Sequence, residues 1–333
     1  MNSIIRPRRL RKTEAIREMV RENHLEPSDF IYPLFVHEKD FKEEIPAMPG
    51  TFRWDMNGLI NEVTRAWEMG IRCIVLFPKI NDSLKTEDGA ECFNEEGLIP
   101  KAIRKLKKEI PEMAIMTDVA LDPYSCDGHD GLVDETGKIL NDQTIEVLKK
   151  QALTQARAGA DFIGPSDMMD GRVGAIRNAL DSDGFSDVGI ISYTAKFSSA
   201  YYGPFRTALD SAPRENSKKR IPDNKSTYQM DPANSKEALI ESALDQYEGA
   251  DILMVKPGIS YLDIVYRLST FSNKPIAAYN VSGEYSMVKS AAMKNWINEK
   301  DIVLETLLSF KRAGAKLILT YHACDASKWL QDT

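Results

Sequence analysis

Two lysines stand where strand-like runs of the sequence end, and these two residues point most directly to chemistry. Lys196 follows the run 190–195, and Lys256 follows the run 252–255. An ammonium at the edge of an apolar core loses hydration, and a second cation nearby further favours the neutral amine that attacks carbonyl carbon. A single lysine in such a place is explained equally well by a head group that reaches out to water. Two of them predict Schiff-base catalysis.

Other polar and aromatic side chains also lie at the ends of predicted strands. Asp118 and Asp122 follow the third strand, and a carboxyl group there can carry the proton that dehydration of a carbinolamine requires. Active sites of β/α barrels form at the carboxyl ends of the strands. We therefore expect one site at this end, lined in addition by Phe77, Ser166, Tyr279, Ser282 and Tyr321.

Two loops supply further candidates. Asp122, Cys126, His129 and Asp130 fall within nine residues, a spacing that could hold a metal but is not a regular zinc pattern, and a polar turn facing water explains it equally well. The long polar insertion at about 197–232 carries Arg206 and Lys225, which could bind a substrate carboxylate or simply be solvated. A loop of this length is typical of a lid.

The elements that must position these residues alternate along the chain. Helical patterns such as 144–158, 238–247 and 302–312 separate short apolar runs. Eight such runs predict a closed (β/α)₈ TIM barrel. The alternative, an open doubly wound sheet, lacks the expected Gly-rich loop after its first strand. The eight predicted strands are 30–36, 73–77, 114–120, 162–165, 189–195, 252–255, 276–281 and 317–321.

The chain divides into an N-terminal arm, residues 1–28, and a catalytic barrel, residues 29–333, with the lid at about 197–232. The arm concentrates five cations in Arg6–Lys12 and continues with acids at Glu14 and Glu18. The basic run could mark a transit peptide or a nucleic-acid arm, but the acids that follow it favour a segment for subunit contacts.

Composition limits the partners and the location. The 333 residues carry a net charge of −7, which gives no general attraction to nucleic acid or to an anionic membrane. No apolar run approaches the ~20 residues that span a bilayer, and no apolar secretory leader is visible. Four scattered cysteines do not suggest a disulfide framework. We expect a cytoplasmic protein without nucleic-acid or membrane partners.

Several motifs resemble those of the porphobilinogen synthase (5-aminolevulinate dehydratase) family, and the resemblance extends over nearly the whole chain. The two lysines lie within two of them, Tyr-Thr-Ala-Lys-Phe at 193–197 and Met-Val-Lys-Pro-Gly at 254–258. The other matching segments are 117–124, 164–172, 202–206, 224–232, 281–285 and 311–315.

The resemblance implies a homo-octameric lyase that condenses two molecules of 5-aminolevulinate to porphobilinogen with loss of two waters, early in haem and tetrapyrrole biosynthesis. It implies that Lys256 forms an imine with the substrate on the propionate side, whose carboxylate Ser282 and Tyr321 bind. Lys196 holds the substrate on the acetate side. The resemblance assigns that second carboxylate to Arg206 and Lys225, with Gln229 nearby.

The resemblance also bears on metals. Zinc-dependent members carry three cysteines where this chain has Ala120, Asp122 and Asp130, so we do not expect a catalytic Zn²⁺. The aspartate-bearing form resembles the magnesium-responsive branch, in which an allosteric Mg²⁺ lies away from the active site at a subunit interface. Glu241 matches its ligand, and Asp167 and Arg172 match residues that surround it.

Two other classes of function compete with this interpretation. A class I Schiff-base aldolase on the same barrel needs only one lysine, whereas two lysines and two carboxylate-binding sets favour the condensation of two acids. A non-catalytic oligomeric scaffold with a basic arm predicts no reactive lysine at all.

Overall fold

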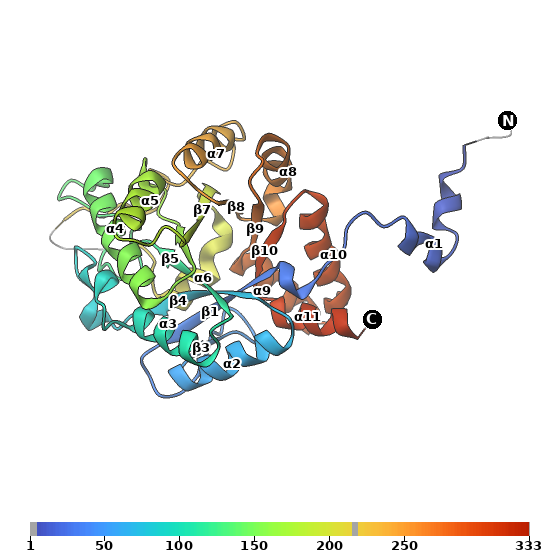
Figure 1. Ribbon diagram of the computed structural model, residues 1–333, viewed down its shortest axis with the longest axis horizontal. Coiled ribbons are helices and arrows are strands. Elements are labelled where there is room, and N and C mark those ends of the chain that lie inside the picture. Colours follow the sequence, from blue (N-terminus) through green and yellow to red (C-terminus); the bar gives the residue numbers. More distant parts are fainter. Residues whose placement is uncertain (1–4, 215–218, 333) are drawn as a thin grey trace.

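Eight parallel strands close into a barrel, because β10 pairs with β1 as well as with β9 (Figure 1). The structure is a computed structural model and describes residues 5–214 and 219–332. It confirms the predicted (β/α)₈ TIM barrel, and every predicted strand is present to within two residues at each end. The barrel strands are β1 Phe30–His37, β4 Cys73–Lys79, β5 Ala114–Val119, β6 Phe162–Pro165, β7 Gly189–Lys196, β8 Ile252–Lys256, β9 Ile276–Asn280 and β10 Leu317–Thr320.

Helices connect consecutive strands and surround the barrel, as right-handed βαβ crossovers require. Gly159 and Gly314 follow α4 and α10 with φ of 107° and 104°, a left-handed conformation that ends a helix at little cost only for glycine. The helices are α2 Met56–Glu68, α3 Leu98–Glu109, α4 Asn141–Ala158, α5 Arg172–Ser182, α6 Gly203–Leu209, α7 Glu237–Tyr247, α8 Leu262–Phe271, α9 Ser282–Met293, α10 Glu299–Arg312 and α11 Ala323–Gln331.

Two apolar clusters stabilise the fold. One packs the outer faces of the strands against the helices and includes Leu76 and Leu106. The other fills the barrel with residues such as Phe35, Met116 and Met254, and it extends to Leu209 of α6 at the mouth. The segment that contains α6 therefore lies over the open end of the barrel.

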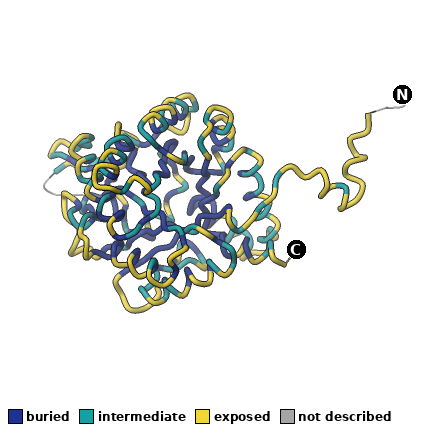
Figure 2. The backbone as a smooth tube through the Cα atoms, viewed as in Figure 1, coloured by how far each residue is buried: buried dark blue, intermediate teal, exposed yellow. Residues whose placement is uncertain are grey.

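Two features lie outside the repeating pattern. A short antiparallel pair, β2 Glu43–Glu44 and β3 Phe52–Trp54, extends the sheet beside β1 and was not predicted. The chain from residue 5 to the first strand extends away from the barrel and includes the short helix α1 Glu14–Met19, and no residue of α1 is buried (Figure 2). None of the helices in the described residues is both long enough and apolar enough to cross a bilayer.

Candidate active site

Lys196 and Lys256 are direct neighbours across β7 and β8. The register of these strands shifts between Ser192 and Ala195, so β7 has one residue more than β8 over this stretch. Such a bulge reverses which side chains point inward. Ile191 and Tyr193 face the barrel interior, and after the bulge Lys196 pairs with Lys256 instead of pointing outward. Both lysines are buried, with exposed fractions of 6% and 5%.

The Lys256 ammonium lies in an aromatic cage. Four rings surround Nζ, with ring centroids at 4.5 to 5.2 Å. Cation–π contacts of about 0.5–2 kcal/mol each offset burial only in part. Burial and the positive charge of Lys196 lower the pKa of Lys256 to about 7, so that a large neutral fraction exists at physiological pH. The cage consists of Tyr193, Tyr202, Phe205 and Tyr279.

Lys196 instead has a carboxylate partner. Its Nζ donates to Asp130 Oδ2 at 2.9 Å and to the carbonyl of Ser166. Asp130 also accepts from Lys225 at 2.6 Å through its other oxygen, and Lys225 donates to Asp122 at 3.2 Å. Gln229 Nε2 reaches Asp130 at 3.5 Å. The loop after β5 and the predicted lid thus meet over Lys196 in one buried network.

Asp118 on β5 is a carboxyl group with a pKa suited to proton exchange near neutrality, and the charges of both lysines act on it. Burial raises the pKa of Asp118 to about 6, and the charges of Lys256 and Lys196 limit that rise. Groups with a pKa close to the working pH are the most effective acids and bases. The two groups also act on each other: the charge of Asp118 raises the pKa of Lys256, and the charge of Lys256 lowers the pKa of Asp118.

The remaining predicted substrate residues surround the two lysines. Tyr279 and Tyr321 share a hydrogen bond of 2.8 Å between their hydroxyls. Ser282, at the start of α9, accepts from the Phe205 amide at 3.0 Å. Phe77 packs edge-on to Phe205, with centroids 5.0 Å apart. Arg206 is half-buried on α6 and has no ion pair among the described residues.

The predicted metal ligand lies on α7 and not at the strand ends that carry the two lysines. Glu241 on α7 is half-buried, and burial, with a smaller contribution from nearby acids, raises its pKa to about 7. Arg172 is fully buried and binds Asp245 at 3.2 Å and the Tyr193 carbonyl at 3.2 Å. Asp167 lies 3.9 Å from Arg172. Arg172 therefore connects α7 to the strand of Lys196, and within the described part of the chain neither Arg172 nor Asp167 forms a hydrogen bond to Glu241.

Sequence reasoning missed three features of the site. It left Asp130 as an uncertain metal residue, whereas Asp130 is the shared partner of two lysines. It named Tyr279 but no other member of the cage around Lys256. It also gave no role to His129, whose ring nitrogens contact the Tyr228 hydroxyl and the Pro222 carbonyl, each at 2.9 Å. The available signals for the cage were the position of Tyr193 in the motif that contains Lys196 and the positions of Tyr202 and Phe205 in the matching segment 202–206.

Fold and site together define a β/α-barrel enzyme with two adjacent buried lysines at the mouth. The profile of the delta-aminolevulinic acid dehydratase family matches residues 4–329. The chain belongs to this family and is a lyase.

Similar proteins agree with this assignment. The chloroplastic delta-aminolevulinic acid dehydratase of Chlamydomonas reinhardtii is 55% identical over 98% of this chain and 84% of its own length. Chloroplastic delta-aminolevulinic acid dehydratase 1 of Arabidopsis thaliana is 53% identical over 99% of this chain and 75% of its own. The crystal structure of the Toxoplasma gondii ME49 enzyme, in complex with the reaction product porphobilinogen, is 51% identical. It has a TM-score of 0.96 and covers 100% of this chain and 93% of that one.

The expected cytoplasmic location is wrong. Relatives at 53–55% identity are named as chloroplastic proteins, which contradicts the expectation. The expectation rested on a missing apolar leader, which plastid transit peptides also lack, and on Glu14 and Glu18, which led us to set aside a transit peptide at the basic run.

Proposed function

We propose that this chain condenses two molecules of 5-aminolevulinate to porphobilinogen through Schiff bases on Lys256 and Lys196. The observation that carries the proposal is the pairing of the two lysines in register at the barrel mouth. A single-lysine aldolase needs neither this pairing nor the bulge that produces it. Two ketones held as imines on neighbouring strands lie close enough to be joined, because adjacent strands are only about 4.8 Å apart.

The lysines begin in different protonation states. Neutral Lys256 attacks the ketone of one substrate, water leaves, and the imine withdraws electrons so that an adjacent carbon can lose a proton. Lys196 starts as an ammonium paired with Asp130 and must lose a proton before it attacks the second ketone. Asp118 is placed to carry protons for these steps, since its pKa is about 6.

We assign to each lysine its own set of residues that bind a substrate carboxylate. Tyr321, linked to the cage residue Tyr279, and Ser282 are proposed to bind the propionate-side carboxylate beside Lys256. Arg206, Lys225 and Gln229 are proposed to bind the acetate-side carboxylate beside Lys196, and Ser166 and Phe77 are proposed to contact the substrates. Lys225 is already held by Asp122 and Asp130, so Arg206 supplies the cation that is free to pair with the substrate.

The pH dependence of turnover tests the proposed role of Lys256. The amine attacks only when neutral, so kcat/KM should fall about tenfold per pH unit below the pKa of about 7 and level off above it. For an ordinary lysine, with a pKa of about 10.4, kcat/KM would keep rising up to about pH 10. Porphobilinogen formation measured from pH 5.5 to 10 distinguishes the two. A rate that keeps rising to pH 10 would exclude a neutral Lys256 in the resting enzyme.

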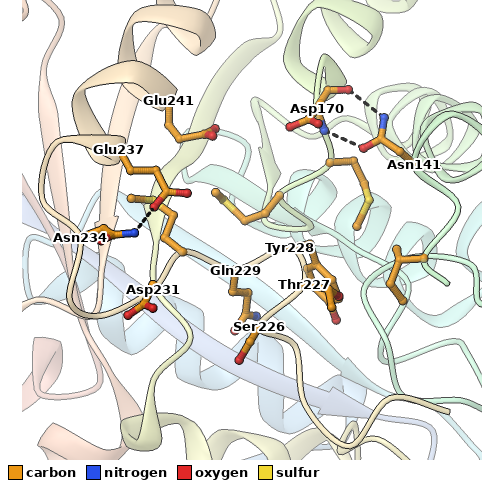
Figure 3. Close-up of a pocket in the computed structure, with 14 residues that line it drawn as sticks. Asn141, Asp170, Ser226, Thr227, Tyr228, Gln229, Asp231, Asn234, Glu237 and Glu241 are labelled. Atoms are coloured by element: carbon orange, nitrogen blue, oxygen red, sulfur yellow. Dashed lines mark hydrogen bonds between the residues drawn. The ribbon is translucent and has the colours of Figure 1, made fainter. Parts of the chain in front are cut away.

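The family is metal-dependent, and the donor chemistry of this chain favours Mg²⁺ away from the lysines. Glu241, Glu237 and Asp170 line a polar cavity of about 400 Å³ between α7 and the loop after β6 (Figure 3). Such oxygen ligands suit Mg²⁺, which would act there as an allosteric ion. A catalytic Zn²⁺ does not fit, because Asp122 and Asp130 are already neutralised by lysines.

Magnesium binding is expected to weaken on acidification. The pKa of Glu241 is about 7, so the ion must displace a proton at low pH, and its affinity should fall by roughly fivefold from pH 7 to pH 6. Titration calorimetry at several pH values measures this change. Glu241→Gln should remove the binding, while Glu305→Gln, which changes an exposed acid on α10, should not. Unaltered Mg²⁺ affinity in Glu241→Gln would place the ion elsewhere.

The arm supports the proposal of a homo-octamer. Leu10 and Met19 are 54% and 76% exposed, although apolar side chains of this size are usually covered. A second copy of the chain is the partner that would cover them. Sedimentation of the chain with and without residues 1–28 tests whether the arm contributes to assembly.

A further inference from the structure

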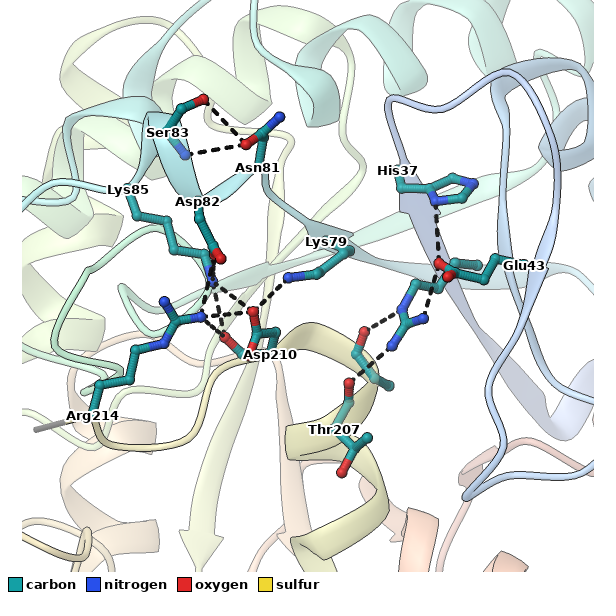
Figure 4. Close-up of polar contacts among 12 residues, drawn as sticks. His37, Glu43, Lys79, Asn81, Asp82, Ser83, Lys85, Thr207, Asp210 and Arg214 are labelled. Carbon is teal, nitrogen blue, oxygen red and sulfur yellow. Dashed lines mark hydrogen bonds and ion pairs between the residues drawn. The ribbon is translucent and has the colours of Figure 1, made fainter.

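Four cations converge on the C-terminal end of α6, and three of them are labelled in Figure 4. Arg53 donates to the Ala208 carbonyl at 2.6 Å and to the Thr207 carbonyl at 2.9 Å. Lys85 and Arg214 donate to the Asp210 carbonyl at 2.9 and 3.2 Å. We call this set the α6 clamp: Arg53, Lys79, Lys85 and Arg214.

Asp210 follows α6 directly and is bound by three of the four clamp residues. Its Oδ2 accepts from Lys79 and from Arg214, both at 2.7 Å. Burial would raise the pKa of Asp210, but Lys79, Lys85 and Arg214 outweigh this and lower it, so Asp210 stays ionised. Asp82 balances part of the positive charge through Lys85 and Arg214, both at 3.2 Å. Glu43 pairs with Arg53 at 3.0 Å.

Helix α6 needs such support because it is only seven residues long. Isolated helices of this length are not stable in water, and the last carbonyls of any helix lack partners within the helix. Cations at that end satisfy these carbonyls and interact favourably with the helix dipole. Asp210 also has a φ of 54°, a left-handed conformation that costs a non-glycine residue energy unless neighbours hold it.

The clamp acts one turn away from Arg206. The Arg206 carbonyl accepts the amides of Asp210 and Ser211, so the backbone of Arg206 belongs to the same helix end. Its guanidinium has no ion pair among the described residues. The position of α6 therefore determines where the Arg206 guanidinium lies. On the same helix, Phe205 contacts Phe77 and covers Lys256 at 4.9 Å.

We propose that Arg53, Lys79 and Lys85 are positioning residues for the substrate carboxylate that Arg206 binds, because they fix the C-terminal end of α6. The inference rests on the proposed function of Arg206. It also gives the additional strand β3 a role, since β3 carries Arg53 from beside β1 to the helix end. The clamp residues do not touch the substrate themselves.

Kinetics of two single variants test the proposal. Arg53→Met and Lys79→Met should each raise the KM for 5-aminolevulinate about tenfold and change kcat by less than about threefold. Arg53→Lys can keep one hydrogen bond to a backbone carbonyl of α6, so it should recover part of the affinity for 5-aminolevulinate. Arg177→Met is the matched control, because Arg177 also donates to two backbone carbonyls, those of Phe185 and Val188, but not at α6. Its KM should match the unchanged protein.

Hydrogen exchange of the peptide 203–211 provides a readout that does not depend on turnover. Its amides should exchange faster in Arg53→Met and Lys79→Met and at the original rate in Arg177→Met. An unchanged KM in both folded clamp variants would overturn the proposal, as would unchanged exchange in both. If the unsubstituted chain forms no porphobilinogen, the proposed function fails instead. Faster exchange in the clamp variants would then still support the claim that the clamp residues fix the C-terminal end of α6.

Discussion

Replacing Lys256 by Met is expected to lower kcat by about 10⁴-fold or more while the barrel remains folded. The amine that forms the first imine disappears, and no described neighbour in the cage can replace it, since the four rings around Nζ carry only hydroxyl groups or none. Met has a similar volume and is apolar. The substitution therefore replaces a buried amine that has no carboxylate partner by a side chain that packs well among the aromatic rings.

The measurement is porphobilinogen formation under saturating 5-aminolevulinate, accompanied by thermal unfolding of the same preparation. Lys316→Met is the control, because Lys316 precedes β10 at the opposite end of the barrel and its side chain is 70% exposed. We expect full activity in this control. Activity of Lys256→Met above one-hundredth of the original would remove Lys256 from the chemical step.

Asp130→Asn is expected to lower both stability and activity. The substitution keeps the shape of the side chain but leaves Lys196 without its carboxylate and Lys225 with Asp122 alone. Breaking a buried ion pair costs about 3 kcal/mol or more of unfolding free energy. Loss of the group that orients Lys196 should also lower kcat by about 100-fold.

A pH profile separates this effect from general damage. The Asp130 charge raises the pKa of Lys256, so its removal should move the acid limb of kcat/KM to lower pH. Asp127→Asn is the matched control: Asp127 lies in the same loop and forms a buried pair with Lys219 at 2.5 Å. Asp127→Asn should lower the free energy of unfolding but leave the acid limb of kcat/KM at the same pH. An unmoved limb in Asp130→Asn would contradict the proposed coupling between the two lysines.

Much of the fold could be predicted from the sequence because alternating apolar runs and helical patterns depend on local spacing. The strand ends then placed Lys196 and Lys256 at one end of the barrel. The inward direction of Lys196 could not be predicted, since it depends on a bulge within β7 that simple alternation does not reveal.

The surroundings of the lysines were also beyond prediction. The cage around Lys256 combines side chains from β7, the turn before α6, α6 and β9, and only the folded chain brings them together. The same is true of Asp130, whose spacing fits a metal loop and whose actual partners are lysines 66 and 95 residues further along the chain. Charge pairing across such separations leaves no local pattern.

Borohydride reduction in the presence of 5-aminolevulinate, followed by mass mapping of the peptides, tests most directly whether two amines act in one cavity. The account predicts reduced adducts on both Lys256 and Lys196, a mass increase at Lys256 at neutral pH that disappears in Lys256→Met, and no adduct on the control Lys316. Reduction that labels neither lysine, or that labels only one of them at any substrate concentration, would contradict a condensation carried out by this pair.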